Sequence, residues 1–333
     1  MLRTLFRTGL LLTAVTFTAG SSEVVHGSVH RDTIWSPALG VRKEMRVYLP
    51  PSYDVAPGAT RRYAVAVYLH GRWGDETDLT YKGRLAQVMD SLVSRGMPEM
   101  IVVMPDGDDG WWTSWESPAD LAACRSQVHR RETVDEFCVV SPHYDEYVAH
   151  DVLAHVDSTY RTLARRESRG IGGLSMGGYG AFAIAANHPD VFGAAVSHGG
   201  VLMPGLMPDS TALAQGGPVT WHVGRTTAEL QQATGARWAT MAPMFGVDPT
   251  TWQARDPARL FASLKSRGAP IPALYADVAV RDEALPQNRA FRDAMRVNRV
   301  PMAYGEFEGT HTWIYWRAHV PVGLSFLSAH LMR

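Results

Sequence analysis

The sequence predicts an α/β fold: a mostly parallel central sheet with helices on both faces. Short, continuously apolar segments, typical of strands buried on both faces, alternate with longer segments whose apolar residues recur at helical spacing. This alternation indicates repeated β-α-β units, which build parallel sheets. No obvious linker interrupts the chain, so residues 23–333 are expected to form a single domain.

Seven segments are expected to be strands. Residues 44–49 alternate like an outer strand and end at Pro50 and Pro51, which cannot donate a hydrogen bond to a sheet. The other expected strands are apolar or nearly so: residues 63–69, 100–104, 170–174, 193–197, 273–276 and, more weakly, 303–307.

Helical spacing lies between these segments. In residues 84–94, for example, Leu85, Val88, Met89 and Leu92 share one face. Further helices are expected at residues 144–160, 178–187, 288–297 and 319–331. Residues 197–250 are rich in glycine, proline and methionine and fit neither pattern. They are expected to leave the sheet and could wall a substrate cleft.

Composition and charge exclude several classes of protein. The chain has 333 residues, of which 46% are hydrophobic and 20% are charged. This apolar content excludes an intrinsically disordered chain, and the length excludes a small scaffold that needs disulfides or metal to fold. The 32 basic and 33 acidic residues give a net charge of −1, so a nucleic-acid partner is not expected.

Residues 1–22 are expected to be a secretory signal peptide. Arg3 and Arg7 precede an apolar stretch at residues 10–17, and small residues follow at 18–22. The apolar stretch is much shorter than the ~20 residues of a membrane span. A buried first helix and an uncleaved anchor are the alternatives. The mature protein is therefore expected to be secreted or periplasmic, with no stable membrane span after cleavage.

The two cysteines, Cys124 and Cys138, are expected to form a disulfide. An even number of cysteines in an exported chain favours pairing, which would close the polar loop between them. His129 and His143 each follow a cysteine in the sequence at a spacing that metal ligands can have. The Cys-x-x-Cys spacing of a structural zinc site is absent, however, so the disulfide is preferred.

The strongest chemical motif is at residues 173–177, which read Gly-Leu-Ser-Met-Gly. This G-x-S-x-G pattern follows an apolar strand and opens an alanine-rich helix, the context in which it marks a nucleophilic serine on a sharp turn. Ser175 is therefore the candidate nucleophile. The backbone N–H of Met176, at the helix N-terminus, would face developing negative charge. The alternative is a glycine-rich packing turn without catalytic function.

A second motif, His-Gly-Arg-Trp-Gly, follows the strand that ends at residue 69. A loop at this point supplies the second backbone donor of an oxyanion hole when a G-x-S-x-G serine is the nucleophile. The backbone N–H of Arg72 is the candidate donor. His70 precedes the nucleophile in the chain and is expected to be structural.

The acid and the base are expected after the serine in the chain. His311, between the last strand and the last helix, is the best candidate base. His319 is the next candidate and is expected to face outward from its helix. Asp282 follows a strand by a short loop and could hold the imidazole of His311. Asp277 and Glu283 lie nearby and leave the choice of acid open.

Together these motifs resemble the putative-esterase branch of the α/β-hydrolases. That branch includes esterase D (S-formylglutathione hydrolase), secreted feruloyl and acetylxylan esterases, and the mycolyltransferases. The resemblance runs from about residue 47 to residue 326. It rests on residues 68–71, 103–107, 144–147, 173–178, 286–291 and 309–313.

The resemblance implies an α/β-hydrolase fold and a catalytic machinery that needs neither a metal nor a cofactor. By position it gives the roles of nucleophile, acid and base to Ser175, Asp282 and His311. The oxyanion hole falls to the backbone N–H groups of Met176 and Arg72.

The chain departs from the family pattern in two places. Residues 278–281 stand where relatives often have a Cys-Gly pair before the acid. The segment bounded by Cys124 and Cys138 is an insertion that could rim the cleft.

Three tryptophans, Trp111, Trp112 and Trp115, follow Asp106 and Gly107 on the side of the sheet where this fold keeps its site. They could line a pocket for an acyl, sugar or aromatic group. They could equally form a hydrophobic plug beneath a long loop, and the sequence leaves both interpretations open.

The sequence thus predicts a secreted serine hydrolase that cleaves carboxylic esters through a Ser-His-Asp triad and an acyl-enzyme. The expected substrate is a small-molecule or carbohydrate-linked ester, such as a feruloyl or acetyl ester. One alternative is acyl transfer of the mycolyltransferase type, which shares the acyl-enzyme. Another is a hydrolase fold that has lost activity and serves as a binding protein.

Overall fold

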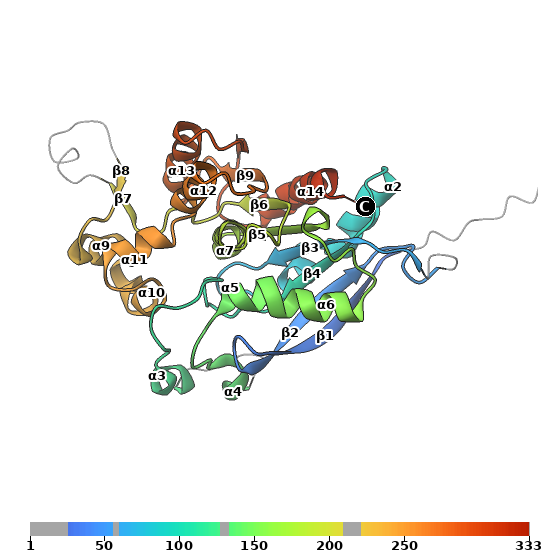
Figure 1. The fold of residues 1–333 in the computed structure, drawn as a ribbon, viewed down its shortest axis with the longest axis horizontal. Helices are drawn as coiled ribbons and strands as arrows, with labels where there is room; N and C mark the ends of the chain where they lie inside the picture. Colours follow the sequence, from blue (N-terminus) through green and yellow to red (C-terminus); the bar gives the residue numbers. More distant parts are fainter. Residues whose placement is uncertain (1–25, 56–59, 127–132, 209–220, 333) are drawn as a thin grey trace, which may run out of the picture.

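The computed structural model describes residues 26–55, 60–126, 133–208 and 221–332 (Figure 1). The predicted signal peptide at residues 1–22 lies outside the described residues. No helix within the described ranges is both long and apolar enough to cross a membrane.

The main sheet has eight strands in the order β1-β2-β4-β3-β5-β6-β9-β10 (Figure 1). The strands β3, β4, β5, β6, β9 and β10 run parallel, and β2 pairs antiparallel with both β1 and β4. Their bounds are β1 Ser28–Ser36, β2 Val41–Leu49, β3 Ala64–Leu69, β4 Met100–Pro105, β5 Arg169–Leu174, β6 Ala194–His198, β9 Ala273–Ala279 and β10 Ala303–Phe307.

All seven predicted strands are present in the main sheet, and one strand of this sheet was not predicted. The continuous apolar segments became β3, β4, β5, β6 and β9, because each of these strands lies inside the sheet. The unpredicted strand, β1, is an edge strand whose sequence, SVHRDTIWS, is mostly polar and partly exposed. Its pairing with β2 fixes it, and that pairing is not visible in its own sequence.

Helices cover both faces of the sheet (Figure 1). On one face lie α5 (Tyr144–Glu146), η2 (Tyr147–Val152), α6 (Leu153–Thr159), α7 (Met176–Asn187), α12 (Pro257–Ser266) and α13 (Leu285–Val297). On the other face lie α1 (Asp78–Tyr81), α2 (Leu85–Ser94) and α14 (Trp313–His330). Short helices α3 (Leu121–Arg125), α4 (Val134–Phe137) and η3 (Arg166–Ser168) lie in connections.

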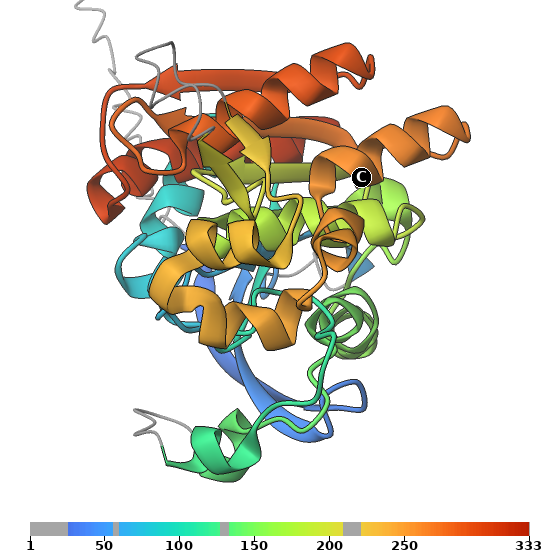
Figure 2. The same ribbon diagram turned by 90° about the vertical axis from the view of Figure 1, so that its left-hand side faces the viewer.

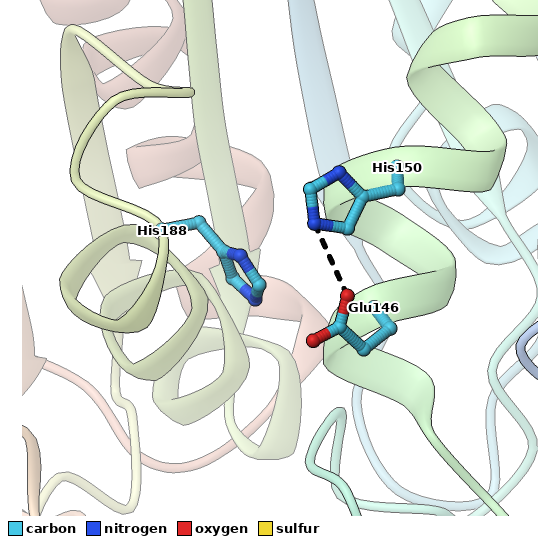
Figure 3. Close-up of side chains that lie close together, drawn as sticks. All are labelled: Glu146, His150 and His188. Atoms are coloured by element: carbon cyan, nitrogen blue, oxygen red, sulfur yellow. Dashed lines mark ion pairs between the residues drawn. The ribbon is translucent and has the colours of Figure 1, made fainter.

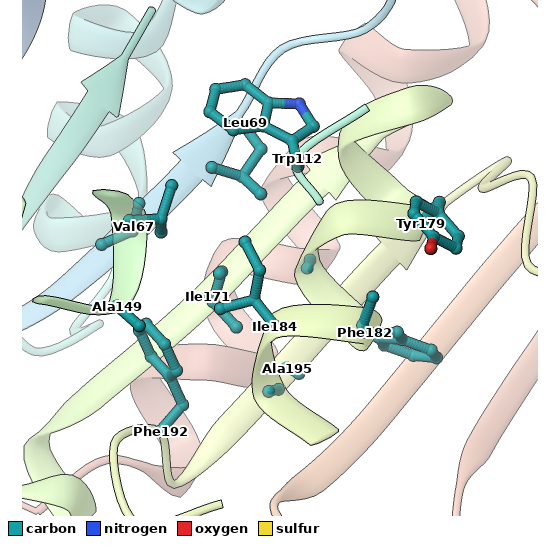
Figure 4. Packing of buried hydrophobic residues seen from close by; sticks show 14 of the residues in the cluster. Val67, Leu69, Trp112, Ala149, Ile171, Tyr179, Phe182, Ile184, Phe192 and Ala195 are labelled. Carbon is teal, nitrogen blue, oxygen red and sulfur yellow. The ribbon is translucent and has the colours of Figure 1, made fainter. Parts of the chain in front are cut away.

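The strands feed both hydrophobic cores by alternation. In β3, for example, Val65 and Val67 enter one core while Ala66 and Tyr68 enter the other. Figure 4 shows the first core, where Phe182 and Ile184 of α7 pack close to the strands. Nearly every residue of α7 is buried, so this helix is held rigidly against the sheet.

Helix α14 begins earlier than the sequence predicted. The expected span was residues 319–331, whereas the helix begins at Trp313, after the N-cap Thr312. Its first turn, Trp-Ile-Tyr-Trp, consists of weak helix formers, so the sequence did not predict a helix there. Burial of Tyr315 and Trp316 against the sheet stabilises that turn.

Residues 202–208 and 221–254 leave the sheet, as the composition suggested. They form a small hairpin, β7 (Leu206–Pro208) and β8 (Trp221–Val223), and the helices α9 (Thr227–Thr234), η4 (Gly235–Arg237), α10 (Trp238–Phe245) and α11 (Pro249–Ala254). Figure 2 looks onto this group, which we call the excursion.

Candidate active site

The candidate nucleophile lies on a strained turn between β5 and α7. Ser175 has a φ of 55°, a conformation that residues other than glycine rarely adopt. Its backbone N–H donates to the carbonyl oxygen of His198 at 3.0 Å, which ties the turn to the end of β6. The turn therefore holds the side chain at the carboxyl edge of the parallel strands.

The two glycines of the motif are required by close backbone contact. A Cβ on Gly173 would lie 2.2 Å from the carbonyl oxygen of Gly177. A Cβ on Gly177 would lie 2.3 Å from the carbonyl oxygen of Leu69. No side chain fits either position without moving the backbone, which explains the spacing around the serine.

The structure brings Ser175, His311 and Asp282 into one hydrogen-bonded chain. Oγ of Ser175 is 2.8 Å from Nε2 of His311, and Nδ1 of the same ring is 2.8 Å from Oδ2 of Asp282. With the proton on Nδ1, the ring donates to the carboxylate and accepts from the serine hydroxyl. This tautomer is the one that a general base needs.

The surroundings fix the carboxylate and the imidazole. The side chain of Asp282 is fully buried, and its Oδ1 accepts the backbone N–H of Ala284 at 2.8 Å. The His311 side chain is 25% exposed, and the ring of Trp316 packs edge-on against it with centroids 5.0 Å apart. Trp316 therefore supports the base.

The two residues expected to supply the oxyanion hole both lie at the cavity that contains the serine. Met176 is the first residue of α7, so its N–H has no acceptor within the helix and lies at the positive end of the helix dipole. Arg72 follows β3 in a turn closed by a hydrogen bond from Gly74 N–H to the Gly71 carbonyl at 3.1 Å. Arg72, Met176 and Ser175 line the same cavity.

His70 is buried and holds the loops on either side of it. Its Nδ1 is 2.8 Å from the carbonyl oxygen of Gly71, and its Nε2 accepts the N–H of Gly107 at 3.1 Å. Burial opposes the charged imidazole, but the nearby carboxylate of Asp106 raises the pKa of His70 overall. These contacts fit the structural role expected for this residue.

A second histidine–aspartate pair joins the neighbouring strands β6 and β9. Nδ1 of His198 is 2.8 Å from Oδ2 of Asp277, and both side chains are fully buried. Burial alone would raise the pKa of Asp277, but the charge and hydrogen bond of His198 lower it. Asp277, an alternative acid in the sequence, is therefore paired with His198 rather than with His311.

The prediction that His319 faces outward is wrong. Its side chain is mostly buried, and its ring stacks on Tyr315 with centroids 4.0 Å apart. Its Nδ1 lies 3.7 Å from Oδ2 of Asp277. The ring faces the protein interior because His319 lies one helical turn after Tyr315, on the buried face of α14.

A cavity of about 720 Å³ opens onto Ser175. One wall comes from residues near the proposed triad: Arg72, Trp73, Trp111, Glu283, Ala284, Pro286, Gln287 and Trp316. The excursion and the segment leading into it supply the other wall: Val201, Leu206, Met207, Pro208, Trp221, Gln232, Ala233 and Arg237. The segment that sequence patterns could not assign therefore does wall the cleft.

The three tryptophans after β4 have different positions. Trp111 lines the cavity and packs edge-on against Tyr179. Trp112 is a plug: it is completely buried and its Nε1 donates to the carbonyl oxygen of His70 at 3.2 Å. Trp115 packs against the core and donates to Gly110, away from the described cavity lining. The suggestion of a pocket contact is thus corrected for Trp112 and Trp115.

Two cavity tryptophans were not predicted. Trp73 is exposed at the cavity and lies in the oxyanion motif itself, with a φ of 61°. Trp221 lies in β8, within the excursion. The sequence could have indicated Trp73, because it is an aromatic residue within the oxyanion motif. No motif near Trp221 in the sequence linked that residue to the site.

Cys124 and Cys138 form a disulfide with their Cα atoms 5.8 Å apart. The helices α3 and α4 that carry this disulfide lie apart from the excursion (Figure 1). None of the described residues between the two cysteines lines the cavity. The expectation that this insertion rims the cleft is therefore not met by the described part of the loop.

Comparison with known proteins identifies the family. The model of the family described as "Putative esterase" matches residues 36–327. The chain belongs to this family. One curated relative is an endo-1,4-β-xylanase/feruloyl esterase of Xylanibacter ruminicola, which is 27% identical over 201 residues. The matched residues are 59% of this chain and 25% of that protein. An esterase of Mycobacterium tuberculosis is 26% identical over 284 residues, covering 83% of this chain and 54% of that protein.

The family member also resembles solved structures. A ferulic acid esterase superposes with a TM-score of 0.66 at 22% identity, covering 92% of this chain and all of that chain. This likeness shows the α/β-hydrolase fold that the sequence predicted. The chain spans a quarter to about half the length of the curated relatives named above.

Proposed function

We propose that this chain hydrolyses carboxylic esters through an acyl-enzyme on Ser175. The supporting observation is the chain of two 2.8 Å hydrogen bonds from Ser175 through His311 to Asp282, at the wall of a large cavity. In this proposal the Ser175 oxygen attacks the ester carbonyl carbon while Nε2 of His311 takes the hydroxyl proton. Asp282 holds the ring in the required tautomer and stabilises the imidazolium that forms.

The N–H groups of Met176 and Arg72 would bind the negatively charged oxygen of the tetrahedral intermediate. Removal of one such donor in other serine hydrolases costs about 2.7–4 kcal/mol of transition-state stabilisation. His311 then gives its proton to the leaving alcohol, which departs and leaves the acyl-enzyme. A water molecule then loses a proton to the same imidazole and attacks the acyl carbon. The bond from that carbon to the Ser175 oxygen breaks, the imidazolium returns the proton to this oxygen, and the acid is released.

The cavity favours an ester with a bulky acyl group. A volume of about 720 Å³ lies within the range of pockets that bind drug-sized ligands. An acetyl group would fill little of it. Trp73, Trp111 and Trp221 offer aromatic surface, while Arg237 and Gln287 offer polar contacts. A feruloyl ester of a carbohydrate suits this combination, and a feruloyl esterase is among the relatives.

We also propose that the protein is exported. The charged and apolar pattern of residues 1–22 supports a secretory signal. A disulfide between Cys124 and Cys138 suits an oxidising compartment. We therefore place the mature enzyme in the periplasm or outside the cell.

The test compares wild type with Ser175→Ala on p-nitrophenyl esters from acetate to decanoate, and on ferulate. Wild-type activity that is lost in the variant, together with loss of labelling by a fluorophosphonate probe, is the expected result. Equal activity in both proteins would show that another residue is the nucleophile. A wild type that is folded but not labelled would favour the binding-protein alternative. Faster product release with an added acceptor alcohol, and formation of its ester, would identify acyl transfer.

A further inference from the structure

A cluster of potential metal ligands lies at the far end of the helix that carries the serine. Figure 3 shows Glu146, His150 and His188, whose side chains converge from two helical segments. Ser175 is the N-cap of α7 and His188 is its C-cap, so the helix of 12 residues, about 18 Å long, separates the two. The cluster is thus distinct from the proposed active site.

The donor atoms of the three residues are already close. Each residue offers one ligand atom, and these atoms all lie within 4.8 Å of one another. Nε2 of His150 is 3.1 Å from Oε2 of Glu146, one helical turn earlier. The rings of His150 and His188 meet edge-on with centroids 5.1 Å apart. A fourth oxygen, Oδ2 of Asp145, is 3.8 Å from Nε2 of His188.

The His188 imidazole gives this cluster an unused donor. Its Nε2 is buried and makes no hydrogen bond within the described part of the chain, and the side chain is only 12% exposed. A buried ring nitrogen without a hydrogen bond is costly unless something binds it. The lone pair of a neutral imidazole nitrogen would meet that need by binding a metal ion.

We propose that Glu146, His150 and His188 bind one divalent transition-metal ion, of which Zn²⁺ is the best match. Two imidazoles and one carboxylate are a ligand set that zinc accepts with tetrahedral geometry. A fourth position remains for Asp145 or water. The helix C-terminus at His188 adds a partial negative charge that favours a cation.

The side chains need only a modest adjustment. Zinc–ligand bonds of about 2.0–2.1 Å place tetrahedral donor atoms roughly 3.3 Å apart. Glu146 and His150 already have that spacing, and both side chains are exposed and free to rotate toward His188. Glu146 is the N-cap of η2, a π-helical segment that contains His150, and such segments often occur at functional sites.

The ion would join α7 to the helix that runs from Tyr144 to Thr159. It would stabilise the folded state, because the ligands converge only when these two helices are packed together. The sequence offered one signal, the Glu-x-x-x-His spacing from 146 to 150, which places both residues on one helix face. The third ligand comes from another helix and could not be assigned from the sequence.

The test uses the full protein without a polyhistidine tag, treated with a chelator and then titrated with ZnCl₂. Isothermal titration should give one ion per chain. At a free Zn²⁺ concentration about 100 times the dissociation constant, the Tm should rise by about 5 °C and return on addition of EDTA. Co²⁺ in place of Zn²⁺ should give the visible absorption of a tetrahedral nitrogen–oxygen site. None of these measurements depends on esterase activity.

The variants decide which residues bind the ion. His150→Ala and His188→Ala should each weaken binding by more than tenfold. His150 is exposed, so its replacement leaves folding intact even if His188→Ala proves unstable. The matched control is His30→Ala, an exposed histidine on β1 outside the cluster, which should bind like wild type. No saturable binding by wild type, or equal binding by wild type and His150→Ala, would overturn the proposal.

Discussion

The substitution Asp282→Asn tests the proposed triad at the atom that orients the base. Asp282 accepts two hydrogen bonds, from Nδ1 of His311 at Oδ2 and from the backbone N–H of Ala284 at Oδ1, each 2.8 Å long. An asparagine of the same shape has one acceptor and one donor. The backbone N–H can only donate, so the amide oxygen should stay on Ala284 and the amide NH₂ should face His311.

That exchange changes the tautomer of the base. Facing a donor, Nδ1 of His311 must accept, and the ring proton moves to Nε2. Nε2 then cannot take the proton of Ser175. The same change in a serine protease with this constellation lowers kcat by about 10⁴. We expect a similar loss here, equivalent to roughly 5 kcal/mol of transition-state stabilisation. KM should change little, because Asp282 does not line the cavity.

The assay is steady-state hydrolysis of a p-nitrophenyl ester, with the Tm measured in parallel. Glu308→Gln is the matched control: it neutralises a carboxylate three residues from His311 whose side chain is 80% exposed. The control should keep kcat within a few-fold of wild type. A fall in kcat of less than tenfold in a folded Asp282→Asn protein would refute the tautomer argument.

Three further predictions concern stability. Gly177→Ala places a Cβ 2.3 Å from the carbonyl oxygen of Leu69; it should cost about 1–3 kcal/mol or more and lower kcat, and a wild-type Tm would contradict this. Replacing both Cys124 and Cys138 by alanine opens a loop with a sequence separation of 14. This should cost about 3 kcal/mol in urea unfolding while kcat stays within a few-fold; unchanged stability would show that the loop is held by other contacts. Burial raises the pKa of Asp256 to about 6, so the folded state binds a proton that the unfolded chain releases, and stability should fall as pH rises from about 4 to 6. Asp256→Asn keeps the N-cap of α12 and should remove this fall, worth up to about 3 kcal/mol; parallel stability curves for the two proteins would count against it.

The central strands and the candidate nucleophile could be predicted because their signals are local. A strand buried on both faces must be apolar along its whole length, as β3 and β4 are. The turn at Ser175 needs glycine on both sides because the backbone passes within 2.3 Å of where a Cβ would be. Each of these two requirements concerns only a few consecutive residues.

Features that depend on contacts between distant segments were harder to predict. The edge strand β1 is polar, and only its pairing with β2 makes it a strand. The sequence favoured Asp282 as the acid but left Asp277 as an alternative, because both residues lie within one short stretch of the chain. The structure pairs Asp277 with His198 and Asp282 with His311, according to which partner each strand end faces.

The sequence by itself determined the seven predicted strands of the main sheet and their order along the chain, the sharp serine turn and the short list of candidate acids and bases. Tertiary structure alone decided that Trp112 fills the core while Trp111 lines the cavity, that the excursion forms a wall, and that His188 meets Glu146 and His150. The physical reason is distance along the chain. Periodicity and turn chemistry act between near neighbours, whereas burial and ligand geometry depend on which segments pack together.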